Sequence, residues 1–188
     1  MLAERKFLKL PWHSPPHFSY DEPHDYHVTA ACYEHQPYIG HSLGRMEAFA
    51  HELHQTLDMA TEQVYAWCVL PNHYHLLVRT KDIQRLAKYL GQLHGRASYD
   101  WNGMESARGR KVFHRASGRA IRSSAHFWAT VNYIHHNPVH HGYVEKWLEW
   151  PWSSAIDYMK QVGRAEAERI WREFPVLDYG KGWDEASL

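Results

Sequence analysis

Two histidines separated by one tyrosine stand in the segment LPNHYHLLV, residues 70–78. In a β-strand, residues i and i+2 point to the same face, so a strand over 73–79 would project His73 and His75 together. Two neutral imidazoles are good ligands for a divalent transition metal, and they leave positions for a third ligand and a substrate oxygen. The spacing therefore predicts part of a metal site on one face of a sheet.

A tyrosine and an asparagine stand four residues apart in the segment HFWATVNYIHHNPVHHG, residues 126–142. In a helix, Tyr133 and Asn137 would share one face. A tyrosine phenol can act as a nucleophile when a base or a metal-held electrophile offsets its high pKa. The amide oxygen of Asn137 could serve as a third metal ligand.

Each of these features also has an ordinary structural explanation. The chain contains 17 histidines, so some His-x-His pairs arise by chance. Tyr133 is compatible with a half-buried helix tyrosine, and Asn137 with a helix end because it precedes Pro138. The two patterns indicate chemistry only if the fold brings them together.

Hydrophobic periodicity and turn residues predict the elements that would position these side chains. Strands are expected over 26–33, 63–70 and 73–79, and Pro71-Asn72 predicts a turn that joins the last two as a hairpin. Helices are expected after the capping residues Ser42, Asp82, and Ser123 or Ser124.

The chain from 100 onwards gives weaker signals. Residues 100–120 predict a loop with a short strand near 111–114, and Pro138 is expected to end or kink the third helix. Another helix is expected from Ser153. The order β-α-β-β-α-β is typical of an α+β, ferredoxin-like (split βαβ) fold, with a central antiparallel sheet, helices on one face and a C-terminal helical tail. The other face of such a sheet would be free to bind.

Composition suggests one main domain. We expect an irregular N-terminal arm over 1–25, the domain over 26–145, and a Trp-rich extension over 146–188 packed on it. No apolar run is long enough to span a bilayer, and the N-terminus lacks the features of a signal peptide. Cys32 and Cys68 have no metal-binding spacing, which favours a reduced, cytoplasmic location.

The charge distribution is uneven although the net charge is zero. Residues 79–122 hold eleven Lys and Arg against three Asp and Glu, which gives this segment +8 and the remainder −8. Zero net charge argues against a uniformly basic nucleic-acid binder, whereas the local excess suits a phosphate-binding face. A solvated helix face and loop would explain the same excess.

In combination, three motifs resemble one family. The segment LPNHYHLLV, then NYIHHNPVHHGYV, then WPWSS is similar to the REP-associated tyrosine transposases, within the single-tyrosine HUH transposases. The resemblance runs from about Tyr26 to Tyr158. It implies the HUH version of the ferredoxin-like fold, with His73 and His75 as metal ligands, Tyr133 as nucleophile and Asn137 completing the metal shell.

The resemblance also implies a reaction and a substrate. The activity would be metal-assisted nicking and joining of single-stranded DNA through a covalent 5′-phosphotyrosine, as in DNA transposition and recombination, with Mg²⁺ or Mn²⁺ as cofactor. The partner would be single-stranded or hairpin DNA formed by REP-like repeats. Candidate backbone-binding residues are Arg79, Arg108, Arg110, Lys111, Arg115, Arg119 and Arg122.

Two other interpretations stay open. The chain could be a domesticated module that binds hairpin DNA without turnover, or a histidine-based metallohydrolase that uses water. Oligomeric state is open as well: a homodimer, with Tyr133 serving either its own or the partner's site, is compatible with the spacing.

Overall fold

A four-stranded antiparallel sheet with the strand order β2-β3-β1-β4 forms the centre of the molecule. This computed structural model describes residues 22–176. The strands are β1 (His24–Ala31), β2 (Gln63–Val69), β3 (His73–Thr80) and β4 (Ser117–Ala120). The helices are α2 (Leu43–Ala60), α3 (Ile83–Met104), α4 (Ser124–His140), α5 (Ala155–Val162) and α6 (Arg164–Glu173). The order β-α-β-β-α-β and the antiparallel pairing confirm the predicted α+β, ferredoxin-like fold class.

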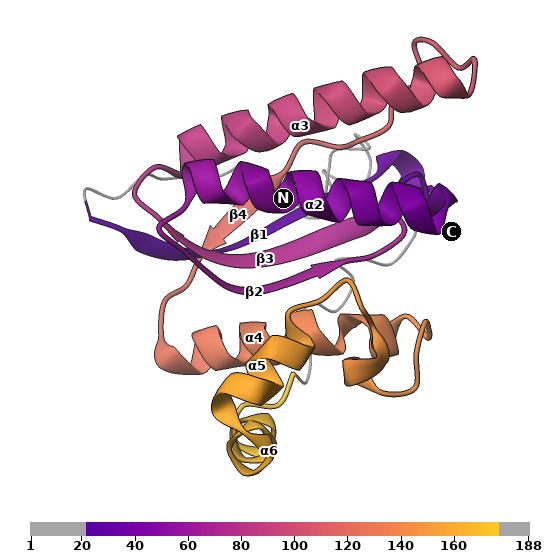
Figure 1. Ribbon diagram of the computed structural model, residues 1–188. Coiled ribbons are helices and arrows are strands. Elements are labelled where there is room, and N and C mark those ends of the chain that lie inside the picture. The colour runs from indigo at the N-terminus through magenta and orange to yellow at the C-terminus, as the bar shows by residue number, and fades with distance from the viewer. Residues whose placement is uncertain (1–21, 177–188) are drawn as a thin grey trace, which may run out of the picture.

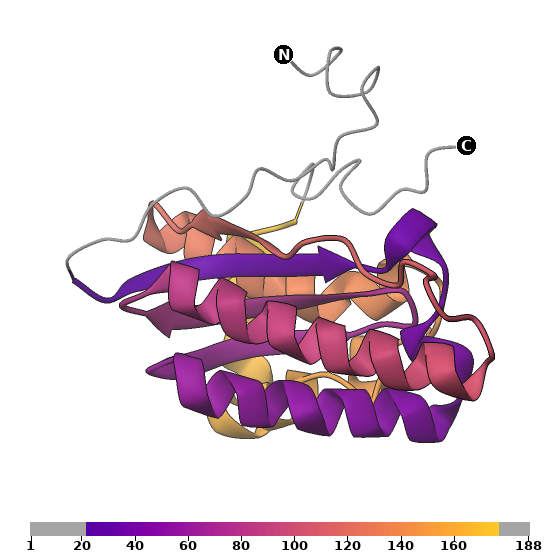
Figure 2. The same cartoon turned by 90° about the horizontal axis from the view of Figure 1, so that it is seen from above.

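The predicted caps start the three long helices. The side chains of Ser42, Asp82 and Ser123 accept hydrogen bonds from backbone N–H groups in the first turns of α2, α3 and α4. Helices α2 and α3 lie side by side across one face of the sheet (Figure 2). The core under them includes Leu53, Tyr74 and Leu90, which are fully buried.

The second face of the sheet is not open, which corrects the expectation that it would be free. Helix α4 packs on β2 and β3 from the side opposite α2 and α3 (Figure 1). It does so because Val131 and Ile134 present an apolar stripe that the strands bury. The helix continues through Pro138 to His140, so the proline does not end it.

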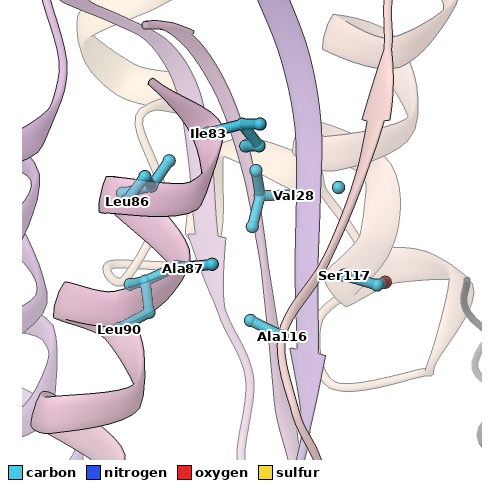
Figure 3. A pocket seen from close by; sticks show the side chains of 8 residues that line it. Val28, Ile83, Leu86, Ala87, Leu90, Ala116 and Ser117 are labelled. Atoms are coloured by element: carbon cyan, nitrogen blue, oxygen red, sulfur yellow. The ribbon is translucent and has the colours of Figure 1, made fainter. Parts of the chain in front are cut away.

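The fourth strand lies later in the chain than predicted. Near 111–114 the chain forms an isolated bridge, between Phe113 and Cys32 directly after β1, and β4 begins at Ser117. Gly118 permits this position because a Cβ there would lie 3.2 Å from Cδ1 of Ile83 on α3. A small apolar hollow at this contact, lined by Val28 and Leu86 among others, is too narrow for a water molecule (Figure 3).

The segment that follows α4 returns to the sheet. Trp150 Nε1 donates to Val69 O (2.9 Å), Val69 N donates to Trp152 O (2.9 Å), and Ser154 N donates to Trp67 O (3.0 Å). The Trp-Pro-Trp-Ser-Ser motif therefore lies along β2. It ties α4, α5 and α6 to the domain, and Trp150 acts as a structural anchor.

The predicted domain boundaries stay predictions. Most of the arm predicted over 1–25 and the last residues of the extension predicted over 146–188 lie outside the described residues. Strand β1 already begins at His24. Helix α6 contacts α4 in the part of the extension that the structure describes. No helix within residues 22–176 combines the length and apolar composition needed to cross a bilayer.

Candidate functional site

The two histidines of β3 lie on the sheet face that α4 covers. Their rings are 5.0 Å apart, centroid to centroid, and both residues are buried, with exposures of 1% for His73 and 0% for His75. Tyr74, between them, points into the core under α2 and α3, where its hydroxyl contacts His94 Nε2 at 3.0 Å. The alternation predicted from the sequence therefore places both imidazoles on one face.

Helix α4 brings the other two predicted site residues to these histidines. Asn137 Oδ1 lies 3.0 Å from His73 Nε2. The Tyr133 ring lies edge-on to the His75 ring, with centroids 5.1 Å apart. One chain thus assembles all four side chains, each of them buried. The helical spacing that puts Tyr133 and Asn137 on one face explains why one helix can contact both histidines.

Two further residues contact the Nδ1 atoms of these histidines. His73 Nδ1 lies 2.7 Å from Asn72 Oδ1, and His75 Nδ1 lies 3.2 Å from His27 Nε2. The amide of Asn72 is fixed because its Nδ2 donates to His35 O at 3.1 Å. Neither His27 nor Asn72 was among the residues predicted from the sequence.

The neighbourhood of His73 fits a cation. Because Asn72 turns its oxygen toward Nδ1, a neutral His73 donates its single N–H there and presents a lone pair at Nε2. That lone pair faces Asn137 Oδ1, a second acceptor, while Asn137 Nδ2 is buried without a hydrogen bond. Two acceptors at 3.0 Å repel each other, and a cation in contact with both would remove this repulsion. Adjacent ligands of an octahedral ion with bonds of about 2.1 Å lie about 3 Å apart.

The candidate metal set is two imidazoles and one amide. Within the described residues, no group of three or more His, Cys, Asp or Glu side chains is arranged to hold a metal. The ring of His141 lies 5.0 Å from that of His73 and covers the same end of the site. A neutral ligand set of this kind leaves the positive charge of a bound ion available to a phosphate.

Two other buried histidines belong to the core. Burial lowers the pKa of His94 and of His135 to about 3, so both are neutral. His94 stacks on Phe113 with ring centroids 4.2 Å apart, and His135 Nε2 lies 2.8 Å from Ser154 Oγ. Their roles are packing and hydrogen bonding.

At least four of the seven predicted DNA-binding residues make contacts within the protein. Arg79 pairs with Asp25 at 3.2 Å, and Arg110 pairs with Glu105 at 2.8 Å and lies over the Tyr38 ring. Arg108 donates to Tyr99 O at 2.6 Å, and Lys111 lies over the Tyr33 ring. Part of the positive charge of segment 79–122 is therefore used in contacts within the protein: Arg79 links β3 to β1, and the other three residues lie in the connection between α3 and β4.

The other three, Arg115, Arg119 and Arg122, are exposed. Arg119 is opposite His27 in the β1–β4 pair, so the two residues share the sheet face that carries the site. Arg119 and Arg122 lie close enough to His126, in the first turn of α4, to lower the pKa of that imidazole further after burial has lowered it. These positive groups gather where α4 begins.

Comparisons with known proteins agree with this architecture. The chain is 29% identical over 117 residues to a Haemophilus influenzae protein named "Putative REP-associated tyrosine transposase", an alignment that covers 53% of this chain and 62% of that protein. The chain thus spans less than two thirds of that relative's length. No family model matches.

Among solved structures, the chain superimposes with a TM-score of 0.61 and 17% identity on a REP-associated tyrosine transposase bound to a REP hairpin, over 81% of this chain and 90% of that one. This likeness shows a shared fold. The expected resemblance is confirmed in sequence and in fold: the chain has the architecture of the REP-associated tyrosine transposases and resembles that family.

Proposed function

We propose that this chain is a metal-dependent single-stranded DNA endonuclease and strand transferase, a transposase that acts on hairpin-forming repeats through a 5′-phosphotyrosine. One observation carries the proposal: α4 places Tyr133 against His75 and Asn137 against His73 in a single chain. The candidate nucleophile, Tyr133, therefore lies beside the candidate cation site formed by His73, His75 and Asn137.

Tyr133 would form and break the covalent bond to DNA. The Tyr133 oxygen forms a new bond to the phosphorus of a DNA phosphodiester and loses its proton, while the bond to the 3′ oxygen breaks. That oxygen takes up a proton and leaves as a 3′-hydroxyl, and the 5′-phosphate stays on Tyr133. The reverse attack by a 3′-hydroxyl rejoins strands without an energy-rich cofactor, because one phosphodiester replaces another.

His73, His75 and Asn137 would hold the metal, with Mg²⁺ or Mn²⁺ the expected ion. When bound, the ion supplies a positive charge that polarises the phosphate and offsets the charge that develops on it. Burial of all three side chains would place the ion in surroundings of low dielectric constant, which would strengthen this attraction. Imidazoles would also accept Zn²⁺ or Ni²⁺ in a purified sample.

The proposed substrate is single-stranded DNA next to a hairpin. The solved structure with the shared fold holds a REP hairpin, which supports this choice. Exposed Arg115, Arg119 and Arg122 would contact the DNA backbone, the last two near the start of α4. Free, buried Cys32 and Cys68 support the proposed cytoplasmic location, where thiols stay reduced. A homodimer stays a prediction.

A denaturing gel tests the covalent step. Purified protein is incubated with single-stranded, hairpin-forming DNA from beside its own gene, with Mn²⁺ or with EDTA. We expect a band that survives SDS with Mn²⁺, is absent with EDTA, and is absent in Tyr133→Phe. Tyr99→Phe is the matched control because Tyr99 is exposed on α3, across the sheet from the site, and this variant should form the band.

Other outcomes point to the alternatives. A native gel shift without any covalent band in the wild type would favour a hairpin-binding module without turnover. Cleavage that persists in Tyr133→Phe would favour hydrolysis by water. Either result would contradict the assignment of Tyr133 as nucleophile.

A further inference from the structure

His27 is a buried histidine that contacts both a candidate ligand and the candidate nucleophile. It lies on β1 with 3% of its surface exposed. Its Nε2 is 3.2 Å from His75 Nδ1, and its ring lies edge-on to that of Tyr133 with centroids 5.8 Å apart. Burial of an imidazole is costly unless its nitrogens are hydrogen-bonded, and the contact with His75 supplies one such bond.

The hydrogen bond restricts where the protons of the two imidazoles can be. A neutral imidazole carries one N–H and one lone pair. Because His75 Nδ1 is engaged by His27, only His75 Nε2 can bind a cation, and the proton of His75 must then be on Nδ1. His27 Nε2 must accept that proton's hydrogen bond, which places the proton of His27 on its own Nδ1.

We propose that His27 is a positioning residue that fixes the tautomer and ring orientation of His75 for metal binding. The inference rests on the proposed metal site and adds a residue that the resemblance does not assign. Asn72 does the same for His73, since its oxygen lies 2.7 Å from His73 Nδ1. Each histidine ligand would thus have one outer partner, and removing such partners typically costs about 10–100-fold in metal affinity.

Three variants separate positioning from packing. His27→Phe keeps a flat ring against Tyr133 and removes the acceptor. His27→Gln removes the ring and supplies an amide oxygen as acceptor. His24→Phe is the matched control, because His24 is on the same strand, is turned to the opposite face, and also takes part in hydrogen bonding, with a contact of 2.8 Å to Ile121 O.

The first readout is the affinity for Mn²⁺ without DNA, measured from the free-ion signal in electron paramagnetic resonance. We expect His27→Phe to bind Mn²⁺ about 10-fold or more weakly than the wild type. His27→Gln should recover part of the loss, and His24→Phe should match the wild type. Equal affinity in His27→Phe and wild type would overturn this inference alone. A wild type that binds no Mn²⁺ would overturn the proposed metal site as well.

The second readout needs no substitution, so it holds even if His27→Phe does not fold. Long-range ¹H–¹⁵N spectra of the Mg²⁺-loaded wild type report which imidazole nitrogen carries the proton. We expect His75 to be protonated on Nδ1, with a coupling through the hydrogen bond to His27 Nε2. A proton on His75 Nε2 would overturn the inference.

Discussion

At the scale of single residues, the proposed role of Asn137 as a metal ligand predicts how stability responds to a cation. Asn137 is 1% exposed, its oxygen faces His73, and its Nδ2 makes no hydrogen bond. In Asn137→Asp the new carboxylate would be buried, which is costly until a cation neutralises it. We therefore expect this variant to melt below the wild type in EDTA and to gain more than the wild type from Mn²⁺, with a difference of about 2–4 °C for each kcal/mol.

Thermal unfolding in EDTA and in Mn²⁺ measures this response. Asn132→Asp is the control, since Asn132 is also buried on α4 but donates to Ile170 O and Phe174 O, away from the histidines. It should lose stability that Mn²⁺ does not restore. If Mn²⁺ raises the melting temperature of Asn137→Asp no more than that of the wild type, Asn137 is not a ligand.

The same scale shows what the sequence could reveal about the site. Strand alternation predicts that His73 and His75 lie on one face of the sheet. The helical repeat predicts that Tyr133 and Asn137 lie on one face of a helix. His27 was missed because its relation to His75 depends on the register of β1 against β3, in which Thr29 is opposite His75. A register between strands that are distant in sequence cannot be read from local periodicity.

At the scale of elements, the β2–β3 turn positions one end of the site. Its Pro71 O accepts from Gly40 N at 2.9 Å, and a Cβ on Gly40 would lie 2.3 Å from Cβ of Pro71. Gly40→Ala must therefore displace the turn that holds Asn72 against His73. We expect a loss of about 1–3 kcal/mol in unfolding free energy and weaker Mn²⁺ binding.

Chemical denaturation and Mn²⁺ titration test this expectation. Gly44→Ala is the matched control because it lies in α2 with open space around its Cβ position, and alanine there should be neutral or stabilising. Equal stability of the two variants would show that the turn moves without cost, and equal Mn²⁺ affinity would show that the turn does not position Asn72.

The packing position of helix α4 could not be predicted from local sequence signals. Its cap and apolar stripe were predictable, but its place over the histidines was not. The position depends on β4, whose weak signal led to a prediction at 111–114 instead of Ser117–Ala120. Only three residues, 121–123, link β4 to α4, so the true end of β4 determines where α4 can pack.

At the scale of the whole molecule, the net charge is zero, and the basic residues of segment 79–122 fall into two groups. Salt bridges within the protein engage Arg79 and Arg110, whereas Arg119 and Arg122 gather at the start of α4 on the site's face. The local excess of basic residues can be read from the sequence. The partners of Arg79 and Arg110, which are Asp25 and Glu105, could be identified only from the structure.

The double variant Arg119→Gln, Arg122→Gln tests whether this end of α4 binds DNA. Each phosphate contact contributes about 0.9 to the slope of log affinity against log salt on duplex DNA, because binding releases counterions. We expect weaker binding of hairpin DNA at low salt and a slope reduced by about 1.8, measured by fluorescence anisotropy over a salt series. The control is the double variant Arg164→Gln, Arg172→Gln. It removes two exposed arginines from α6 and should leave the slope unchanged. An unchanged slope in the first variant would show that Arg119 and Arg122 do not contact phosphates, and Arg115 would then be the next residue to test.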